Sequence, residues 1–430
     1  MPWPFLHAFS LVPAKQGGSA IILASVALCC IMGESPNFAQ VIRPRFVASN
    51  LLCHRLVSEF AGLGEDALQE SKNGTVNYRV FTSTWNVGGV APPDDLDLED
   101  WLDTRANSYD IYVLGFQEIV PLNARNVVGP KNSSATRKWN QLIGDALNKN
   151  KTARTRREEE AEAREQQQKQ QSSFGFRRVA SKQMVGIFVS VWARSGVRRH
   201  VRSPGVSCVG AGVLGRLGNK GAVSVRFLLH GTSFCFVCCH LASGSKCGAV
   251  LLRNADAADI LSRTSFPTAA GLPEKILDHD RVVLLGDLNY RISMDDAEAR
   301  LLVSASKWGM LLENDELLLE LSEGRSFEGW SEGLVTFSPT YKYHRNSDKF
   351  YWCVDGGTAP GGRQKQQRAP AWCDRILWRG KGLKQIEYER CGGYRLSDHR
   401  PVRAAFDAVC EVAGGAVVVD SFLEGHCTLR

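Results

Sequence analysis

Short segments in which apolar and polar residues alternate, or in which apolar residues run together, recur along most of the chain and predict strands. Residues 77–87 alternate, with Val80, Thr82, Thr84 and Asn86 on one side. Residues 110–118 form an apolar run that ends in a carboxylate, as expected of a buried strand. Further strands are predicted at residues 184–192, 221–229, 233–240, 281–285, 372–378 and 401–406.

Helical spacing of apolar residues separates some of these strands. Helices are predicted around residues 139–147, at about 249–263, and after Ser293, where Ser293 and Asp296 form a plausible cap. Only three or so residues join strands 221–229 and 233–240, so these two must pair as an antiparallel hairpin. The predicted fold class is therefore α/β, with mixed sheets flanked by helices rather than a doubly wound parallel sheet.

The chain of 430 residues is predicted to form one large domain with two tails. The domain spans residues 77–410, between a poorly ordered N-terminal extension at 1–76 and a C-terminal tail at 411–430. Residues 151–173 are almost all Lys, Arg, Glu and Gln, so we interpret them as a charged insertion, either an exposed helix or disordered. Apolar residues 20–32 resemble the core of a signal peptide but are too short to span a bilayer. They are either a targeting segment or part of the extension.

Charge and cysteine content bear on the binding partners and on the cellular compartment. The net charge is +7, and a basic cluster of Arg194, Arg198, Arg199, His200 and Arg202 is either a solvated loop or a patch for lipid headgroups or phosphate. The 13 cysteines lack even spacing, which favours reduced thiols in the cytoplasm.

One cysteine pair has the spacing of a metal motif. Cys235 and Cys238 are three positions apart in a predicted strand. Such positions point to opposite faces, so we do not expect the pair to bind a metal.

Polar side chains gather at the ends of the predicted strands. They are Asn86, Glu118, His240, Asp287, Asn289, Asp374, Asp398 and His399. Glu118 and Asn86 offer only oxygen ligands, which suits Mg²⁺. The alternative is that Glu118 pairs with a nearby arginine such as Arg125. The two histidines lack zinc-site spacing, so zinc is not expected.

Hydrolysis of a phosphate ester needs a positioned water, a group that orients or deprotonates it, and positive charge on the phosphoryl oxygens. Asp287 and Asn289 share one turn, so one can serve the water while the other donates to the phosphoryl oxygens. His399 can face the same phosphate if a carboxylate, for which Asp374 is the candidate, holds its other nitrogen. The pattern predicts a metal-dependent phosphatase.

Seven motifs occur in the order found in inositol polyphosphate 5-phosphatases. They are TWNVG at 84–88, FQE at 116–118, GNKG at 218–221, GDLNYR at 286–291, PTYKY at 339–343, PAWCDRIL at 370–377 and SDHRP at 397–401. The chain resembles that family over about residues 77–407. NYRV at 77–80 and the acidic stretch at 94–100 resemble its plant members.

The resemblance implies a four-layer α/β sandwich of the DNase I-like class, with Mg²⁺ at Glu118 and Asn86. It implies an enzyme that removes the 5-phosphate from an inositol ring. It assigns the site roles as follows: Asp287 as general base, Asn289 and His240 on the phosphate, His399 supported by Asp374 at the transition state, and Asp398 near the metal or water.

Other residues match the family's substrate contacts. Tyr341, Lys342 and Arg368 match those that grip the 4-phosphate, and Lys220 is a further candidate. Tyr341 could instead be plain strand packing. Where many members carry a lysine two positions before Arg368, this chain has Gln366, with Lys365 just before it. Either Lys365 takes over the contact of that lysine with the 4-phosphate, or this chain binds the 4-phosphate more weakly.

The resemblance leaves several alternatives open. The expected partners are phosphoinositide lipids or soluble inositol phosphates, and nucleic acid is not expected. The expected location is the cytoplasm, with peripheral contact to the plasma membrane or to endomembranes. The alternatives are a phosphoinositide-binding module with little turnover and a nuclease of the same superfamily.

Overall fold

The computed structural model describes residues 74–106, 109–123, 133–158, 175–212, 215, 217–246, 248–352 and 369–412. Several predictions lie outside these ranges. They concern the apolar run at 20–32 and the rest of 1–73, most of the charged insertion, the tail beyond 412, and the residues Arg125, Lys365, Gln366 and Arg368.

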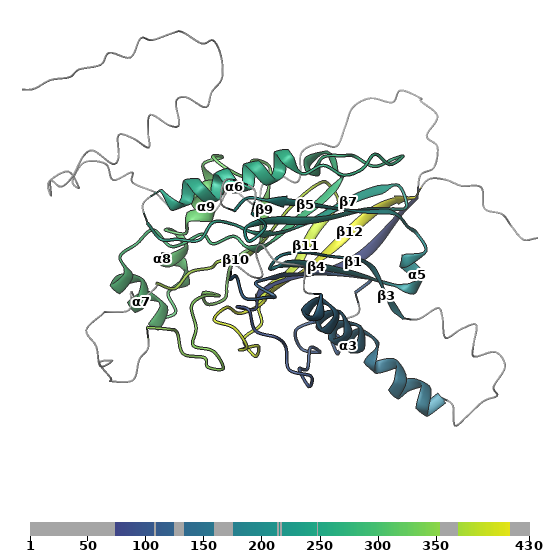
Figure 1. Cartoon of the computed structure of the whole chain (residues 1–430), viewed down its shortest axis with the longest axis horizontal. Coiled ribbons are helices and arrows are strands. Elements are labelled where there is room, and N and C mark those ends of the chain that lie inside the picture. Colours follow the sequence, from purple (N-terminus) through teal and green to yellow (C-terminus); the bar gives the residue numbers. More distant parts are fainter. Residues whose placement is uncertain are drawn as a thin grey trace, which may run out of the picture. The chain divides into compact units, whose positions relative to one another are not determined.

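Two six-stranded mixed sheets form the centre of the described unit (Figure 1). The first has the order β11-β12-β1-β2-β4-β3, and only β1 and β2 run parallel in it. Its strands are β1 (Gly74–Asn86), β2 (Ile111–Gln117), β3 (Phe176–Met184), β4 (Ile187–Arg194), β11 (Leu383–Arg390) and β12 (Val402–Val412).

The second sheet has the order β5-β6-β7-β8-β10-β9, with β7 and β8 as its parallel pair. Its strands are β5 (Val201–Gly210), β6 (Gly221–Leu229), β7 (Thr232–His240), β8 (Arg281–Asp287), β9 (Ser331–Glu332) and β10 (Asp374–Arg379). The antiparallel hairpin of β6 and β7 is confirmed.

The sheets pack face to face and helices cover their outer faces. Val113 of β2 and Phe236 of β7 belong to one buried cluster between the sheets. Helix α3 (Ser134–Glu158) packs Trp139 on the outer face of the first sheet, and α6 (Ala249–Arg263) packs Ile260 on that of the second. Figure 1 shows the two helices on opposite sides of the sheets, so the predicted four-layer sandwich is confirmed. The remaining helical segments are α5 (Ser195–Arg198), η2 (Ile276–Asp278), α7 (Asp296–Ser304), α8 (Trp308–Leu312) and α9 (Glu316–Ser322).

Side chains alternate between the two faces of β7, so Cys235 and Cys238 lie on opposite faces, as predicted. Cys238 lies between the sheets and Cys235 lies under the outer helices, so the two thiols face apart. Both are buried and free. Burial raises the pKa of Cys238 to about 12, as expected of an unreactive core thiol.

Some element predictions were wrong in detail. Asp295, and not Ser293 with Asp296, caps α7, because its side chain accepts from the amides of Ala297 and Glu298. The strand predicted at 184–192 begins at Ile187, since residues 185–186 form the turn between β3 and β4.

Element ends also extend beyond the predicted ones. Strand β1 starts three residues before 77, β12 ends six residues after 406, and α3 reaches eight residues into the charged insertion.

Four strands, β3, β5, β9 and β11, were not predicted. Each stands at an edge of its sheet and has partly exposed residues along its length. Edge strands bury little apolar surface and therefore lack the apolar pattern on which the prediction relied. Within the described ranges, no helix has both the length and the apolar character needed to cross a membrane.

Candidate active site

One end of the sandwich collects the predicted site residues. Asn86 ends β1, His240 ends β7 and Asp287 ends β8, while Glu118 follows β2. These are the carboxyl ends of the two parallel pairs, β1 with β2 and β7 with β8. The two sheets meet there, because Asn86 Nδ2 donates to Asp287 Oδ2 across 2.9 Å.

Asp287 is the centre of this arrangement. Its Oδ1 accepts from the amide of Asn289 at 3.1 Å, and its Oδ2 lies 3.3 Å from His240 Nε2 and 4.0 Å from His399 Nε2. The carboxylate is buried. Burial alone would raise the pKa of Asp287, but the charge of His399 and the hydrogen bond with His240 hold it well below its usual range. Asp287 is therefore ionised at neutral pH.

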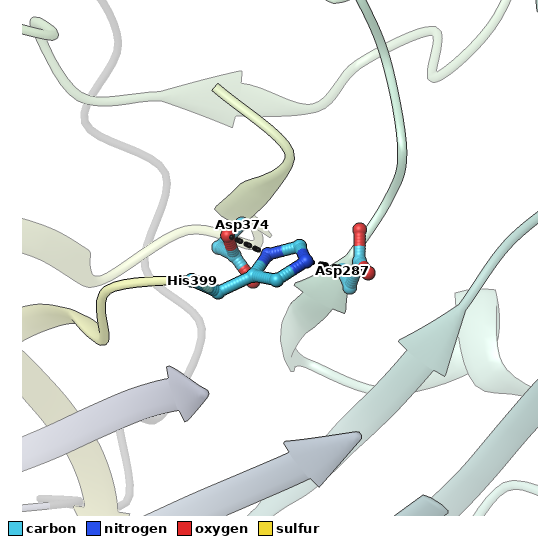
Figure 2. A group of neighbouring side chains, drawn as sticks. All are labelled: Asp287, Asp374 and His399. Carbon is cyan, nitrogen blue, oxygen red and sulfur yellow. Dashed lines mark hydrogen bonds and ion pairs between the residues drawn. The ribbon is translucent and has the colours of Figure 1, made fainter. Parts of the chain in front are cut away.

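His399 is held between two carboxylates. Its Nδ1 contacts Asp374 Oδ2 at 2.8 Å, the contact that the sequence predicted, and its Nε2 faces Asp287 (Figure 2). Thr340 Oγ1 donates to the same Asp374 oxygen at 2.7 Å. Burial opposes the charged ring, yet Asp374 and Asp287 raise the pKa of His399 to about 10. The site thus holds an imidazolium at neutral pH.

The side chains of Asp287, Asp374 and His399 place ligand atoms within 4.8 Å of one another, a spacing that could hold a metal. An imidazolium has no lone pair to give, because both ring nitrogens carry a proton. We therefore interpret this group as a hydrogen-bonded acid–base set and not as a metal centre.

The carboxylates of Glu118 and Asp287, beside Asn86, fit a hard divalent cation better. Glu118 Oε1 lies 3.4 Å from Asn86 Nδ2 and 3.9 Å from His240 Nε2, and the Glu118 side chain is 30% exposed. The ionised Asp287 adjoins the same amide. The two carboxylates give oxygen donors that are open on one side, which suits a cation that keeps water ligands. Asn86 turns its Nδ2 toward both carboxylates, while its Oδ1 accepts from the amide of Gly88 at 3.0 Å.

Two site residues adopt a backbone conformation that is rare for residues other than glycine. The φ angles of Glu118 and Asn289 are 52° and 59°. Such left-handed conformations cost free energy and persist only where the surroundings enforce them, as at functional sites. Glu118 directly follows β2, and Asn289 lies two residues after the end of β8.

Lys220 and His240 form a second contact within the site. The Lys220 ammonium touches His240 Nε2. Burial lowers the pKa of Lys220, and burial together with the Lys220 charge lowers the pKa of His240. His240 is therefore neutral at neutral pH and differs in charge from His399.

Arg291 is a site residue to which the sequence analysis assigned no role. Its Nη2 donates to Asn289 Oδ1 at 2.7 Å, while Asn289 Nδ2 donates to the carbonyl of Leu241 at 3.1 Å. The Asn289 amide is thus fixed at both ends. The signal in the sequence was the GDLNYR motif at 286–291, in which Arg291 closely follows Asp287 and Asn289.

Tyr341 and Lys342 border the same site. The Tyr341 ring is buried, with its centroid 4.6 Å from that of His399 and 4.7 Å from Arg291 Cζ, so it packs within the site wall. Lys342 Nζ pairs with Asp398 Oδ2 at 2.9 Å. Burial would raise the pKa of Asp398, but His399 and Lys342 lower it. Substrate contacts of Tyr341 and Lys342 remain predictions.

The sandwich and its catalytic edge define an enzyme of the endonuclease, exonuclease and phosphatase class. The model of the family described as "Endonuclease/Exonuclease/phosphatase family 2" matches residues 83–405. Two relatives from Arabidopsis thaliana narrow this class. Type IV inositol polyphosphate 5-phosphatase 9 is 54% identical, over 78% of this chain and 79% of its own length, and type I inositol polyphosphate 5-phosphatase 8 is 45% identical, over 77% and 71%. The chain belongs to the inositol polyphosphate 5-phosphatases.

Solved structures agree with this assignment. The inositol polyphosphate 5-phosphatase domain of SpSynaptojanin, crystallised with inositol (1,4)-bisphosphate and a calcium ion, is 30% identical with a TM-score of 0.64, and the match covers 79% of this chain and 87% of that one. Cimex nitrophorin matches with a TM-score of 0.51 at 18% identity, over 78% and 99%, which shows a shared fold only.

Proposed function

We propose that this protein hydrolyses the 5-phosphate of phosphoinositides or soluble inositol polyphosphates, with Mg²⁺ as cofactor. The observation that carries the proposal is the meeting of an ionised Asp287 and a charged His399 beside Glu118 and Asn86. The named activity of the relatives, and the inositol (1,4)-bisphosphate bound to the SpSynaptojanin domain, support the substrate class. That ligand has no phosphate at position 5, and a product of 5-phosphate removal would lack it as well.

In this proposal a negatively charged residue acts on the attacking water and a positively charged residue acts on the phosphoryl oxygens. Asp287 orients the attacking water and takes its proton, while His399 presents an imidazolium to the phosphoryl oxygens. Asp374 positions the His399 ring through its hydrogen bond to Nδ1. Asn289 and His240 bind the phosphate, and the Asn289 amide is already oriented by its two hydrogen bonds.

Glu118 and Asn86 would hold the Mg²⁺ ion, with Asp398 near the metal or the water. Bound Mg²⁺ supplies positive charge to the phosphoryl oxygens and lowers the pKa of water. The SpSynaptojanin domain was crystallised with calcium. Both ions take oxygen ligands, so the choice between them requires a measurement.

The remaining contacts concern the rest of the substrate. We propose that Lys342, Tyr341 and Arg368 bind the 4-phosphate and that Lys220 contributes positive charge beside His240. Lys342 is the best supported, because its ammonium stands at the border of the site, where Asp398 accepts from it.

The basic cluster lies at the other end of the sandwich. His200 stacks on His230 with ring centroids 4.3 Å apart, at the turn between β6 and β7. The catalytic His240 ends the same nine-residue strand β7, about 30 Å away at the rise of an extended chain. A membrane that bound the cluster would thus face away from the active site. We propose a cytoplasmic enzyme whose lipid contact, with plasma membrane or endomembranes, occurs at the catalytic edge.

Phosphate release by the purified full chain tests the function. The substrates are phosphatidylinositol 4,5-bisphosphate, its 3,4,5-trisphosphate and inositol 1,4,5-trisphosphate, each with Mg²⁺, with Ca²⁺ and with chelator. We expect Mg²⁺-dependent release that Asp287→Asn abolishes and that the exposed Asp278→Asn leaves unchanged. Binding without release would favour the binding module, and nicking of plasmid DNA would favour the nuclease.

A further inference from the structure

Residues 342–351 form a short antiparallel hairpin beside the active site. The amide of Tyr351 donates to the carbonyl of Lys342 at 2.8 Å, and that of His344 donates to Lys349 at 2.9 Å. Tyr343 and Phe350 pair between these bonds. The hairpin follows directly after Tyr341, whose ring packs against His399.

One face of the hairpin is anchored in apolar packing. The rings of Tyr343 and Phe350 stack with centroids 4.3 Å apart, and Phe350 stacks on Trp352 at 4.4 Å. Phe350 and Trp352 also pack against the buried cluster around Trp372. Alternate residues of a strand face opposite sides, so Tyr351 between them must face away from this cluster.

The other face carries Lys342, His344 and Tyr351. His344 stacks on the Tyr351 ring, with centroids 5.0 Å apart, and the Lys342 ammonium lies 4.9 Å from the centroid of that ring. The same ammonium lies 5.4 Å from the Tyr341 centroid. Both distances fall within the range in which an aromatic face attracts a cation.

Lys342 is therefore enclosed on three sides, by two rings and by Asp398. The ring contacts attract the ammonium without neutralising its charge, while the ion pair at 2.9 Å competes with any substrate phosphate. A free lysine side chain must also give up rotamer freedom when it binds a ligand, and a ring that already restricts it reduces this loss.

We propose that Tyr351 is a positioning residue that sets substrate specificity. Its ring holds the Lys342 ammonium where a phosphate next to the scissile one can bind it, and it restricts the rotamers of Lys342 beside the ion pair with Asp398. The inference rests on the proposed function, in which Lys342 contacts the 4-phosphate. It concerns only substrates that carry that phosphate.

A matched pair of lipids isolates this role. Dioctanoyl phosphatidylinositol 4,5-bisphosphate and phosphatidylinositol 5-phosphate differ only in the 4-phosphate. With Tyr351→Leu we expect KM for the bisphosphate to rise about 3- to 10-fold, the range expected of a lost cation–π contact, with kcat unchanged. KM for the monophosphate should stay within about twofold. Tyr351→Phe keeps the aromatic face and should restore the wild-type KM.

Phe350→Leu is the control on the opposite face of the hairpin. It should lower Tm without separating the two substrates, because it loosens packing and leaves the ring beside Lys342 in place. An equal rise of KM for both lipids with Tyr351→Leu, or no rise for the bisphosphate, would overturn the inference.

Calorimetry separates failure of this inference from failure of the proposed function. If the wild type releases phosphate from neither lipid, the proposed function fails. Binding of inositol 1,4-bisphosphate and of inositol 1-phosphate then tests Tyr351 independently. A loss of affinity in Tyr351→Leu for the bisphosphate alone would support the role, and equal affinities of wild type and variant would refute it.

Discussion

Replacement of Asp374 by asparagine should shift the pH dependence of the reaction. The pKa of His399, about 10, exceeds the usual 6.5 because Asp374 and Asp287 favour the charged ring. The difference corresponds to about 5 kcal/mol in favour of the imidazolium. Asp374 lies 2.8 Å from the ring and Asp287 lies 4.0 Å from it, so Asp374 accounts for the larger share. Asp374→Asn should therefore lower the pKa of His399 from about 10 toward its usual 6.5.

Initial rates of phosphate release between about pH 6 and pH 10 would measure this change. The wild-type rate should hold until the pH nears 10 and then fall, since the proposed chemistry needs His399 charged. In Asp374→Asn the fall should begin at a lower pH than in the wild type, between about 6.5 and 10. At pH 7 the variant should also be slower by on the order of 100-fold, because an amide holds the ring orientation less firmly.

Stability should follow the same linkage. The folded-state pKa of His399 is raised above its unfolded value, so its contribution to stability is complete below pH 6.5 and is lost as the pH rises through about 10. The wild type should thus lose more of its free energy of unfolding than Asp374→Asn does between about pH 7 and pH 10. If the free energy of unfolding fell equally in the two proteins over this alkaline range, the assigned role of His399 would be refuted.

Three further predictions test the metal site, the buried charges and the backbone of the catalytic edge. Glu118→Gln should raise the Mg²⁺ concentration for half-maximal activity at least about tenfold, and an unchanged requirement would exclude Glu118 as a ligand. Asp315→Asn should lower the free energy of unfolding in urea by about 3–5 kcal/mol, because Asp315 accepts two hydrogen bonds from Arg375 and both side chains are fully buried. A loss below about 1 kcal/mol would contradict this. Gly286→Ala should cost about 3 kcal/mol or more and disturb catalysis, because its Cβ would press against a backbone carbonyl of β7; a variant with wild-type Tm would contradict this.

Local sequence pattern predicted the interior of the fold better than its borders. Strands β6 and β7 and helix α6 occupy the predicted positions, because each buries one face and its apolar spacing records that burial. The edge strands β3 and β11 were missed, since neighbours on one side only leave their residues partly exposed.

The sequence by itself determined the chemical inventory of the site. Asn86, Glu118 and Asp287 stand at the ends of apolar strands, and the order of motifs identified the family. The position of a strand end is a local property, which hydrophobic periodicity records.

Only the tertiary structure decided how these residues meet. Asn86 and Asp287 are 201 positions apart and come from different sheets, yet they form one hydrogen bond at the catalytic edge. The sequence also did not predict three other features. They are the charge of His399, the enclosure of Lys342 by Tyr351 and the location of the basic cluster at the far end of the sandwich. Such contacts depend on how sheets and loops pack, and periodicity along a single segment contains no record of its distant neighbours.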